Sequence, residues 1–267
     1  MRERFSLVPL AYVACLMLPV YWLVTMSFKT NGEIAGDLTL FPHAPTLQHY
    51  AFIFSDPDWY WGYVNALIYV CLNVVIAVTV AIPAAYAFSR RDFFGHRALF
   101  FGLLMFRMMA PAILLVPFVQ IFSDLDLIDT HIAVALAHCF FNVPLAIWIL
   151  EGFISSVPRE MDESAMLDGY GFPRFFVKIL LPQIAPGIAV TAFFCFMFSW
   201  IEFLLANALT TIDAKPIAGI MTRAGGVLVG DYALLAAASV LGLLPGVVLI
   251  FFMKRHLARG FSMGRVL

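Results

Sequence analysis

Long apolar runs alternate with short polar segments along this chain. A helix needs about 20 apolar residues to cross the hydrocarbon core of a bilayer, with each backbone amide bonded inside the helix. Six runs meet that requirement, and they lie near residues 6–28, 63–88, 98–122, 131–153, 184–209 and 233–253. The pattern predicts an all-α, polytopic membrane protein with six transmembrane helices.

The polar segment after the first run, residues 29–62, contains turn-forming residues and an aromatic cluster at 59–63. Aromatic side chains concentrate at the membrane–water interface, where a ring is half wet. We therefore divide the chain into 1–62, a first transmembrane helix with its extracytoplasmic loop, and 63–267, a core of five transmembrane helices. The apolar stretch 5–28 is too long for a cleavable signal, so a retained first span is expected.

Composition strengthens the membrane interpretation. Hydrophobic residues make up 63% of the chain and charged residues 12%, with a mean hydropathy of +0.92, whereas soluble domains are about half apolar and a quarter charged. The net charge of -1 gives no reason to expect nucleic acid as a partner. The four cysteines lie far apart with no C-x-x-C spacing, so we expect small buried hydrophobes rather than a metal or redox site.

The placement of the charges predicts the orientation. With the N-terminus inside, twelve of the 16 Lys and Arg residues fall in inner segments and three in outer segments, while Arg107 lies within a span. The outer loops are acidic instead. Because basic residues are retained on the inner side of a membrane, both termini are expected to be cytoplasmic.

The most informative polar segment is the predicted cytoplasmic loop 155–182, between the fourth and fifth runs. Its residues predict two short helices. Ser155 or Ser156 is expected to cap the first helix, Pro158 suits its opening turn, and Gly169 stops it.

The second helix of this loop is expected to start at Pro173, and Pro182 to bend the chain into the next span. Between the two helices, an exposed apolar knob at 165–167 suits docking into a groove of a partner protein. A helix lying flat on the bilayer is the alternative. Four carboxylates on the first helix argue against it, because they would face anionic lipid.

This loop resembles the EAA loop of the permease subunits of ABC importers. The resemblance is carried by an apolar-Leu-Pro ending at 180–182 and by a preceding run of seven residues, Glu163, Ser164, Ala165, Met166, Leu167, Asp168 and Gly169. Ser164 departs from the family's usual alanine, and Tyr170 is bulkier than the small residue that often follows the glycine. Neither departure changes the expected elbow.

Over nearly its full length the chain resembles the carbohydrate-uptake branch of that family, through segments at 27–30, 83–90 and 199–203. The resemblance implies a type I ABC importer permease fold in a bacterial inner membrane, surrounded by lipid. It also implies a second permease subunit, a pair of cytoplasmic ATPases and an extracytoplasmic solute-binding protein as partners, with Glu163 to Gly169 as the coupling helix seated in an ATPase. The chain contains no Gly-x-x-x-x-Gly-Lys-[Ser/Thr], so ATP and Mg²⁺ are expected on the partner ATPases and no cofactor on this chain.

Four polar or aromatic side chains within the runs are candidates for contact with a transported solute, because such groups are costly in a membrane. They are Arg107, Asn142, Trp200 and Glu202. Arg107 would donate to hydroxyl groups or form an ion pair with Glu202. Asn142 both donates and accepts, Trp200 would stack on a sugar face or serve only in packing, and Glu202 could gate, pair or bind.

The remaining polar residues in the spans predict no chemistry. Asn65 and Asn73 are expected to join helices by hydrogen bonds. His131 and His138 lie seven residues apart without a carboxylate between them, so no metal site is expected. No Ser–His–Asp arrangement or Gly-x-Ser-x-Gly turn stands out, so we expect no enzyme activity.

The sequence thus predicts a permease subunit that imports a small polyhydroxylated solute by alternating access, driven by partner ATPases. Segments 214–223 and 259–266 look like those of permeases for glycerol and related polyols. A mono- or oligosaccharide remains the alternative solute. An ion-coupled secondary carrier is the alternative mechanism, although such carriers usually hold acidic sites near the midplane in two related halves, which this sequence lacks.

Overall fold

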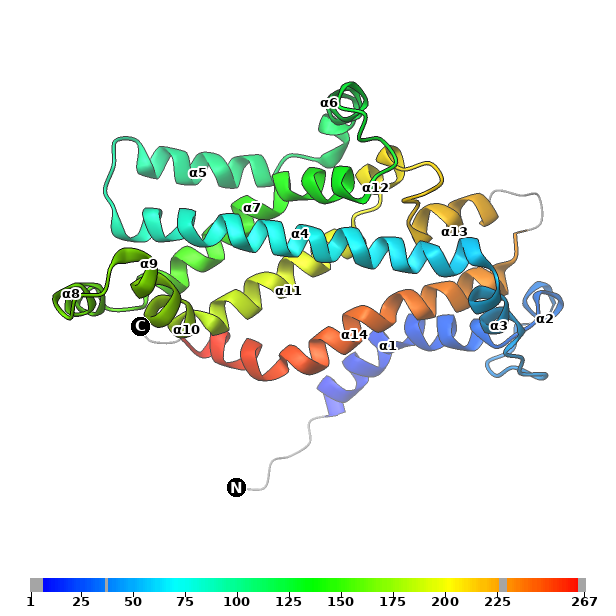
Figure 1. The fold of residues 1–267 in the computed structure, drawn as a ribbon. Helices are drawn as coiled ribbons and strands as arrows, with labels where there is room; N and C mark the ends of the chain where they lie inside the picture. The colour runs from blue at the N-terminus through cyan, green and yellow to red at the C-terminus, as the bar shows by residue number, and fades with distance from the viewer. Residues whose placement is uncertain (1–6, 37, 226–229, 264–267) are drawn as a thin grey trace. The chain divides into compact units, whose positions relative to one another are not determined.

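The computed structural model describes residues 7–36, 38–225 and 230–263, and every regular element in those ranges is helical (Figure 1). The chain divides into two compact units. Unit 1 consists of residues 1–63 and 217–247, and unit 2 of residues 64–216 and 248–267. The predicted boundary at residue 62 between a first helix and a core remains a prediction.

The elements of unit 1 are α1 (Leu7–Ser27), α2 (Asn31–Ala35), α3 (Gln48–Ser55), the start of α4 (Pro57–Arg90), α13 (Ile217–Gly225) and the first half of α14 (Tyr232–Met263). The elements of unit 2 are the rest of α4, α5 (His96–Arg107), α6 (Pro111–Asp124), α7 (His131–Ser155), α8 (Glu160–Leu167), α9 (Phe172–Phe175), the π-helical turn η1 (Phe176–Leu180), α10 (Leu181–Gln183), α11 (Ala185–Ile201), α12 (Leu204–Leu209) and the second half of α14.

Helices within the described ranges confirm a polytopic membrane protein. Four are long and apolar enough to cross a bilayer, at Pro9–Ser27, Pro57–Arg90, His131–Ser155 and Tyr232–Met253. Two bent pairs raise the number to six if each pair forms one span. The six predicted runs therefore correspond to observed helices, but two of them are not continuous.

The predicted continuous helix at 98–122 is wrong, because α5 and α6 meet at an angle of 92°. The break lies just before Pro111, at the start of α6. A proline lacks the amide hydrogen that a helix needs and disfavours helical geometry in the residue before it. Ala110 accordingly has extended backbone angles, with φ -69° and ψ 132°.

The predicted continuous helix at 184–209 is also wrong. α11 ends at Ile201, Glu202 is extended with ψ 117°, and the chain resumes helical geometry as α12. At its other end, α11 makes an angle of 75° with the helical segment Phe172–Gln183. Pro182 lies two residues before that bend, as the sequence predicted.

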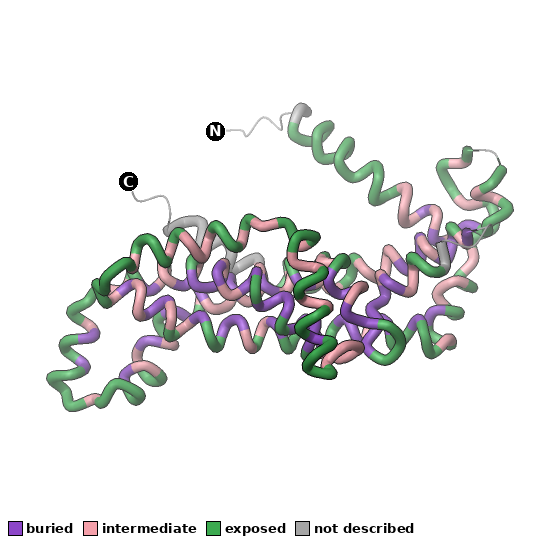
Figure 2. Tube along the Cα trace, turned by 90° about the horizontal axis from the view of Figure 1, so that it is seen from above, coloured by how far each residue is buried: buried purple, intermediate pink, exposed green. Residues whose placement is uncertain are grey.

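Unit 1 is built around the start of α4, α13 and α14. Trp59 and Ile53 are buried against Ile217 and Leu234. Gly62 allows this packing, because a Cβ atom there would lie only 3.0 Å from the Cα atom of Ile217. By contrast, α1 is exposed along most of its length (Figure 2).

Unit 2 is organised around α7, which packs against α5, α11 and α12. The helices are joined by asparagines, as predicted. The Asn73 side chain on α4 donates to the carbonyl of Ala135 on α7 over 3.1 Å, and the Asn65 side-chain oxygen on α4 lies 2.9 Å from the Nε2 atom of His131 on α7. These bonds fix helix positions where an apolar contact alone would not.

The exposure of each cysteine depends on the helix that carries it. Cys139 and Cys195 are buried in unit 2, as expected for small hydrophobes. Cys15 on α1 and Cys71 on α4 are exposed, so the expectation that all four are buried is wrong. Both lie in spans whose outward sides face no other part of the described chain, so an apolar thiol there is suited to lipid.

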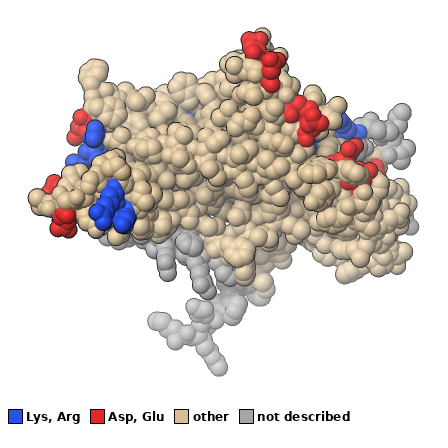
Figure 3. Space-filling view, in the orientation of Figure 1, with Lys and Arg blue, Asp and Glu red and all other residues tan. Residues whose placement is uncertain are grey.

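Segments of unit 2 predicted on the same side of the membrane lie together. The end of α4 is hydrogen-bonded to the segment after α7, and the loop before α7 is hydrogen-bonded to the loop after α12. Basic and acidic side chains lie side by side over the end that carries α8 and α9, and acidic side chains lie over α6 (Figure 3). Arg2, Arg4 and Arg265, which also supported a cytoplasmic position of both termini, lie outside the described residues.

The outer loops of unit 2 are fastened by Asp129, a residue with a positive φ of 62°. Its carboxylate accepts hydrogen bonds from the Thr211 hydroxyl and amide and from the amides of Ile212, Asp213 and Ala214. Burial by itself would raise the pKa of Asp129, but these hydrogen bonds outweigh it and hold the pKa well below its usual range.

We expect Asp129→Asn to lower the melting temperature of the assembled complex, because an amide cannot replace the carboxylate as acceptor of all these bonds. A lowered folded-state pKa contributes stability above the ordinary carboxyl pKa of about 3.9 and loses it as the pH falls toward the folded value. The difference between the two proteins should be constant from about pH 5 to 7 and shrink below about pH 4. Thermal unfolding across this range checks it, with the exposed Asp124→Asn as control; an equal effect of both variants would contradict the assignment.

Candidate functional site

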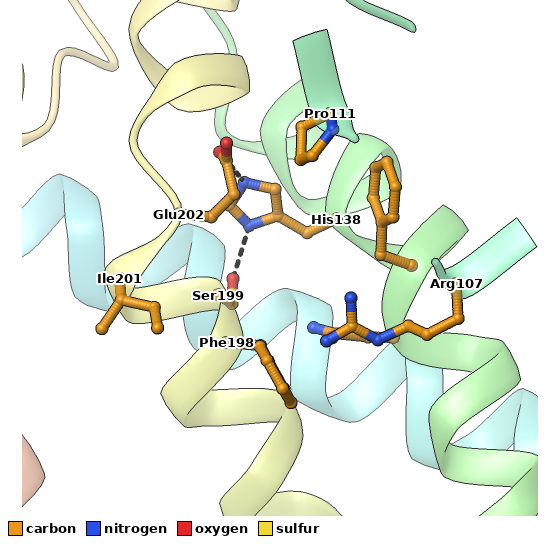
Figure 4. A pocket seen from close by; sticks show the side chains of 9 residues that line it. Arg107, Pro111, His138, Phe198, Ser199, Ile201 and Glu202 are labelled. Carbon is orange, nitrogen blue, oxygen red and sulfur yellow. Dashed lines mark hydrogen bonds and ion pairs between the residues drawn. The ribbon is translucent and has the colours of Figure 1, made fainter. Parts of the chain in front are cut away.

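A pocket of about 140 Å³ lies in unit 2 where the two helix breaks face the middle of α7 (Figure 4). Irregular backbone is tolerated at membrane depth where it is buried in protein or lines a water-filled cavity. The lining comprises Arg107 at the end of α5, Pro111 at the start of α6, His138, Phe141 and Asn142 on α7, and Phe198, Ser199, Ile201 and Glu202 at the end of α11.

The polar centre of the pocket is His138, whose ring bridges two residues of the α11 end (Figure 4). The Nε2 atom lies 3.0 Å from the Glu202 carboxylate, and the Nδ1 atom lies 2.6 Å from the Ser199 hydroxyl. Because an ionised carboxylate only accepts, Nε2 donates to Glu202. In a neutral ring Nδ1 then accepts the Ser199 hydroxyl hydrogen.

Glu202 has a second task, because its carboxylate also accepts hydrogen bonds from the amides at the start of α12. The Leu204 and Leu205 amides donate over 2.9 and 3.1 Å, and the Ala206 amide over 3.3 Å. The break after α11 thus leaves these amides paired, and the negative charge of Glu202 is compensated by His138 and by backbone dipoles.

Arg107 does not pair with Glu202, so the ion pair considered from the sequence is wrong. Its guanidinium lies over the ring of Phe198, 4.0 Å from the centroid. Within the described part of the chain, no carboxylate comes within ion-pair distance of Arg107. The group therefore offers several donors toward the pocket.

The other two predicted contacts differ in their positions. Asn142 lines the pocket, but its amide hydrogens already go to the side chain of Asn73 and the carbonyl of Cys195, over 2.6 and 3.1 Å. Trp200 is not among the lining residues, and its ring stacks on Phe196. A solute contact by Trp200 remains a prediction.

Sequence reasoning considered His138 only as a metal ligand and missed its place in the pocket. Two signals point to it. His138 stands one turn before Asn142 and so shares its helix face, and a carboxylate within the membrane needs a partner. His131 instead bonds to the Asn65 side chain over 2.9 Å. Among the described residues, no three His, Cys, Asp or Glu side chains are grouped to hold a metal.

The second candidate site is the elbow formed by α8 and α9. α8 ends in a Schellman motif, in which the Tyr170 amide bonds to the Ala165 carbonyl and the Gly169 amide to the Met166 carbonyl. Gly169 has a φ of 79°, which confirms that this glycine stops the helix. Leu167 is 88% exposed.

Three details of this elbow differ from expectation. Ala165 is buried rather than part of the exposed knob, and Asp162 also points inward. Neither Ser155 nor Ser156 caps α8, because both complete the end of α7. The Ser155 hydroxyl donates to Glu151 and the Ser156 hydroxyl to the carbonyl of Phe153.

His138→Phe is expected to destabilise the complex, because it removes a hydrogen bond to a charged group that is worth about 1.5–3 kcal/mol. Ile201→Val, which alters the same pocket without touching a polar contact, serves as control. The melting temperature of the purified complex should fall by several degrees for the first variant and hardly change for the second. Equal melting temperatures of wild type and His138→Phe would rule out the bond.

Comparison with known proteins identifies related membrane components of transport systems. The family described as binding-protein-dependent transport system inner membrane component matches residues 77–263. The sulfoquinovosyl glycerol transport system permease protein SmoH of Agrobacterium fabrum is 30% identical, over 97% of this chain and 94% of its own length. The trehalose transport system permease protein SugB of Mycobacterium tuberculosis is 29% identical, over 94% and 92%.

Among solved structures, one chain of a bacterial ABC transporter involved in the import of the acidic polysaccharide alginate superposes with a TM-score of 0.77. It is 19% identical, and the match covers 93% of both chains. At that identity the likeness establishes the fold. Family match, relatives and fold agree: the chain belongs to the binding-protein-dependent transport system inner membrane components, as a multi-pass inner-membrane permease subunit of an ABC importer.

Proposed function

We propose that this subunit moves a small polyhydroxylated solute inward by alternating access, in which the pocket at His138 opens first to the outer and then to the inner face of the membrane. The observation that carries the proposal is the elbow. A helix that ends at Gly169, a residue with a positive φ of 79°, presents the exposed side chains of Met166 and Leu167 at one end of unit 2, while its Asp162 and Ala165 face inward.

In this proposal Glu163 to Gly169 form the coupling helix. Exposed apolar side chains on a short helix fit a groove of a cytoplasmic partner, and the first-turn carboxylates keep the helix off an anionic lipid surface. ATP and Mg²⁺ are bound by a pair of partner ATPases, and this chain has no nucleotide site of its own. A second permease subunit completes the path, and a solute-binding protein delivers the solute from outside.

The solute class follows from the lining of the pocket. Arg107 offers donors and the ring of Phe198 supplies an apolar face, while Ser199 and Glu202, which line the same pocket, are held by His138. Such a mixture suits a molecule with hydroxyl groups on one side and carbon on the other. Asn142 stabilises the wall of the pocket rather than binding the solute, because its side-chain amide hydrogens are already donated to Asn73 and to the carbonyl of Cys195.

Within this class we favour glycerol or a related polyol. Segments 214–223 and 259–266 look like those of permeases for glycerol and related polyols. The names of the relatives favour sugars as the second candidate, since they include permeases for trehalose and for sulfoquinovosyl glycerol. All of these compounds are polyhydroxylated.

Coupling is tested with Leu167→Asp and Gly169→Pro in the transporter reconstituted with all its subunits. Both variants should reduce ATP hydrolysis stimulated by the loaded binding protein at least tenfold, because the first places a charge in the groove and the second breaks the stop of α8. Phe94→Ala, at another exposed apolar residue of the predicted cytoplasmic side, is the control. Normal stimulation in both test variants would overturn the coupling role.

The solute is tested by uptake into proteoliposomes with glycerol and trehalose as probes. Arg107→Met should raise KM for the accepted probe about tenfold, equivalent to losing about 1.4 kcal/mol of binding, with a smaller change in kcat. The neighbouring Met108→Leu should leave both constants unchanged. Uptake of trehalose without glycerol would refute the polyol assignment, and an unchanged KM would remove Arg107 from the site.

A further inference from the structure

The cytoplasmic end of α4 is tied to α8 by a nearly buried ion pair. The Nε atom of Arg90 lies 2.9 Å from a carboxylate oxygen of Asp162, and the two side chains are only 7% and 11% exposed. A pair removed from water in this way is screened less and held more rigidly than a surface pair. Its geometry is therefore part of the structure rather than a passing contact.

Further hydrogen bonds fix both members of the pair. Arg90 also donates from its Nη2 atom to the carbonyl of Val157 over 2.8 Å. Tyr86, one turn earlier on the same face of α4, donates its hydroxyl hydrogen to Asp162 over 3.1 Å. The ring of Tyr86 in turn packs against Phe172 of α9.

Asp162 is the link between α8 and the spans. Within the described part of the chain, no other side chain of α8 makes a hydrogen bond or ion pair to another helix. The remaining acidic residues of α8, Glu160 and Glu163, are exposed. Asp162 is thus the polar link from α8 itself to α4, beside the apolar packing of Ala165 and the hydrogen bond that Arg159, just before α8, donates to the carbonyl of Ser89 over 3.2 Å.

α4 continues from this pair to the wall of the pocket. Asn73 lies 17 residues before Arg90, which corresponds to about 25 Å along a helix. Its side chain accepts a hydrogen bond from Asn142, which lines the pocket. A continuous series of contacts thus leads from α8 to the pocket, through the Arg90–Asp162 pair, α4 and Asn73.

We propose that Arg90 and Asp162 are positioning residues that pass the movement of the coupling helix to α4, and through Asn73 to the pocket wall. The proposal rests on the coupling role of α8 proposed above. Without the pair, α8 would act on the spans through the apolar packing of Ala165, the hydrogen bond between Arg159 and Ser89, and the chain segments that join it to α7 and α11. Tyr86 orients the Asp162 carboxylate toward Arg90 by its hydrogen bond and is the third residue of this connection.

The test uses Arg90→Gln, Asp162→Asn and the double variant in the complete reconstituted transporter, with the binding protein loaded with whichever of glycerol and trehalose supports uptake. Each single variant should retain basal ATP hydrolysis but lose stimulation at least tenfold per assembled complex. The double variant should be no worse than either single variant, because both remove the same connection. Additive losses would overturn the proposal.

A purely structural role predicts a different result, in which less complex assembles but the stimulation per assembled complex is normal. That result would overturn the proposal, as would full stimulation in both single variants. Arg91→Gln is the matched control, since it removes the same charge one residue away, at an exposed position. It should behave as wild type.

A milder variant covers the case in which the pair is needed for assembly. Tyr86→Phe keeps the ring packing and removes only the hydroxyl bond to Asp162, so stimulation should fall about two- to fivefold while assembly is unchanged. No reduction would contradict the inference. Loss of stimulation in Leu167→Asp with normal Arg90 and Asp162 variants would refute this inference alone, whereas normal Leu167→Asp would refute the coupling role itself.

Discussion

A backbone amide without a partner costs several kcal/mol in hydrocarbon, and this requirement decides where the chain leaves helical geometry. The two breaks that border the pocket satisfy it. Pro111 has no amide hydrogen to leave unpaired, and the carboxylate of Glu202 accepts the first amides of α12. The pocket exists because these two breaks face the same part of α7.

Because of the same requirement, the polar side chains of the spans that line the pocket also hold the helices together through hydrogen bonds. Glu202 is held by His138 and by backbone amides, and Asn142 is held by Asn73 and Cys195. Such satisfied groups define the shape of the wall without being free to bind. Arg107 is the lining residue whose donors face the pocket with only an aromatic ring beside them, which makes it the natural contact for a hydroxylated solute.

At the other end of unit 2, the elbow combines an exposed side with an anchored one. Leu167 is turned outward, while Ala165 and Asp162 are turned inward, and Asp162 meets the end of α4. A docked partner could thus move α8 as a rigid piece. The helix that receives this movement is also the helix whose Asn73 contacts the pocket wall.

The sequence by itself determined the all-helical, polytopic architecture, the stop of α8 at Gly169 and the motif of the elbow, because these depend on local hydrophobicity and on the backbone preferences of glycine and proline. Only the tertiary structure decided the break at Glu202, the partnership of His138 with Glu202 and of Arg90 with Asp162, and the position of Trp200 away from the pocket. Such pairings join residues about 60–70 positions apart. No local pattern encodes which distant group will neutralise a buried charge, since that depends on how the helices pack.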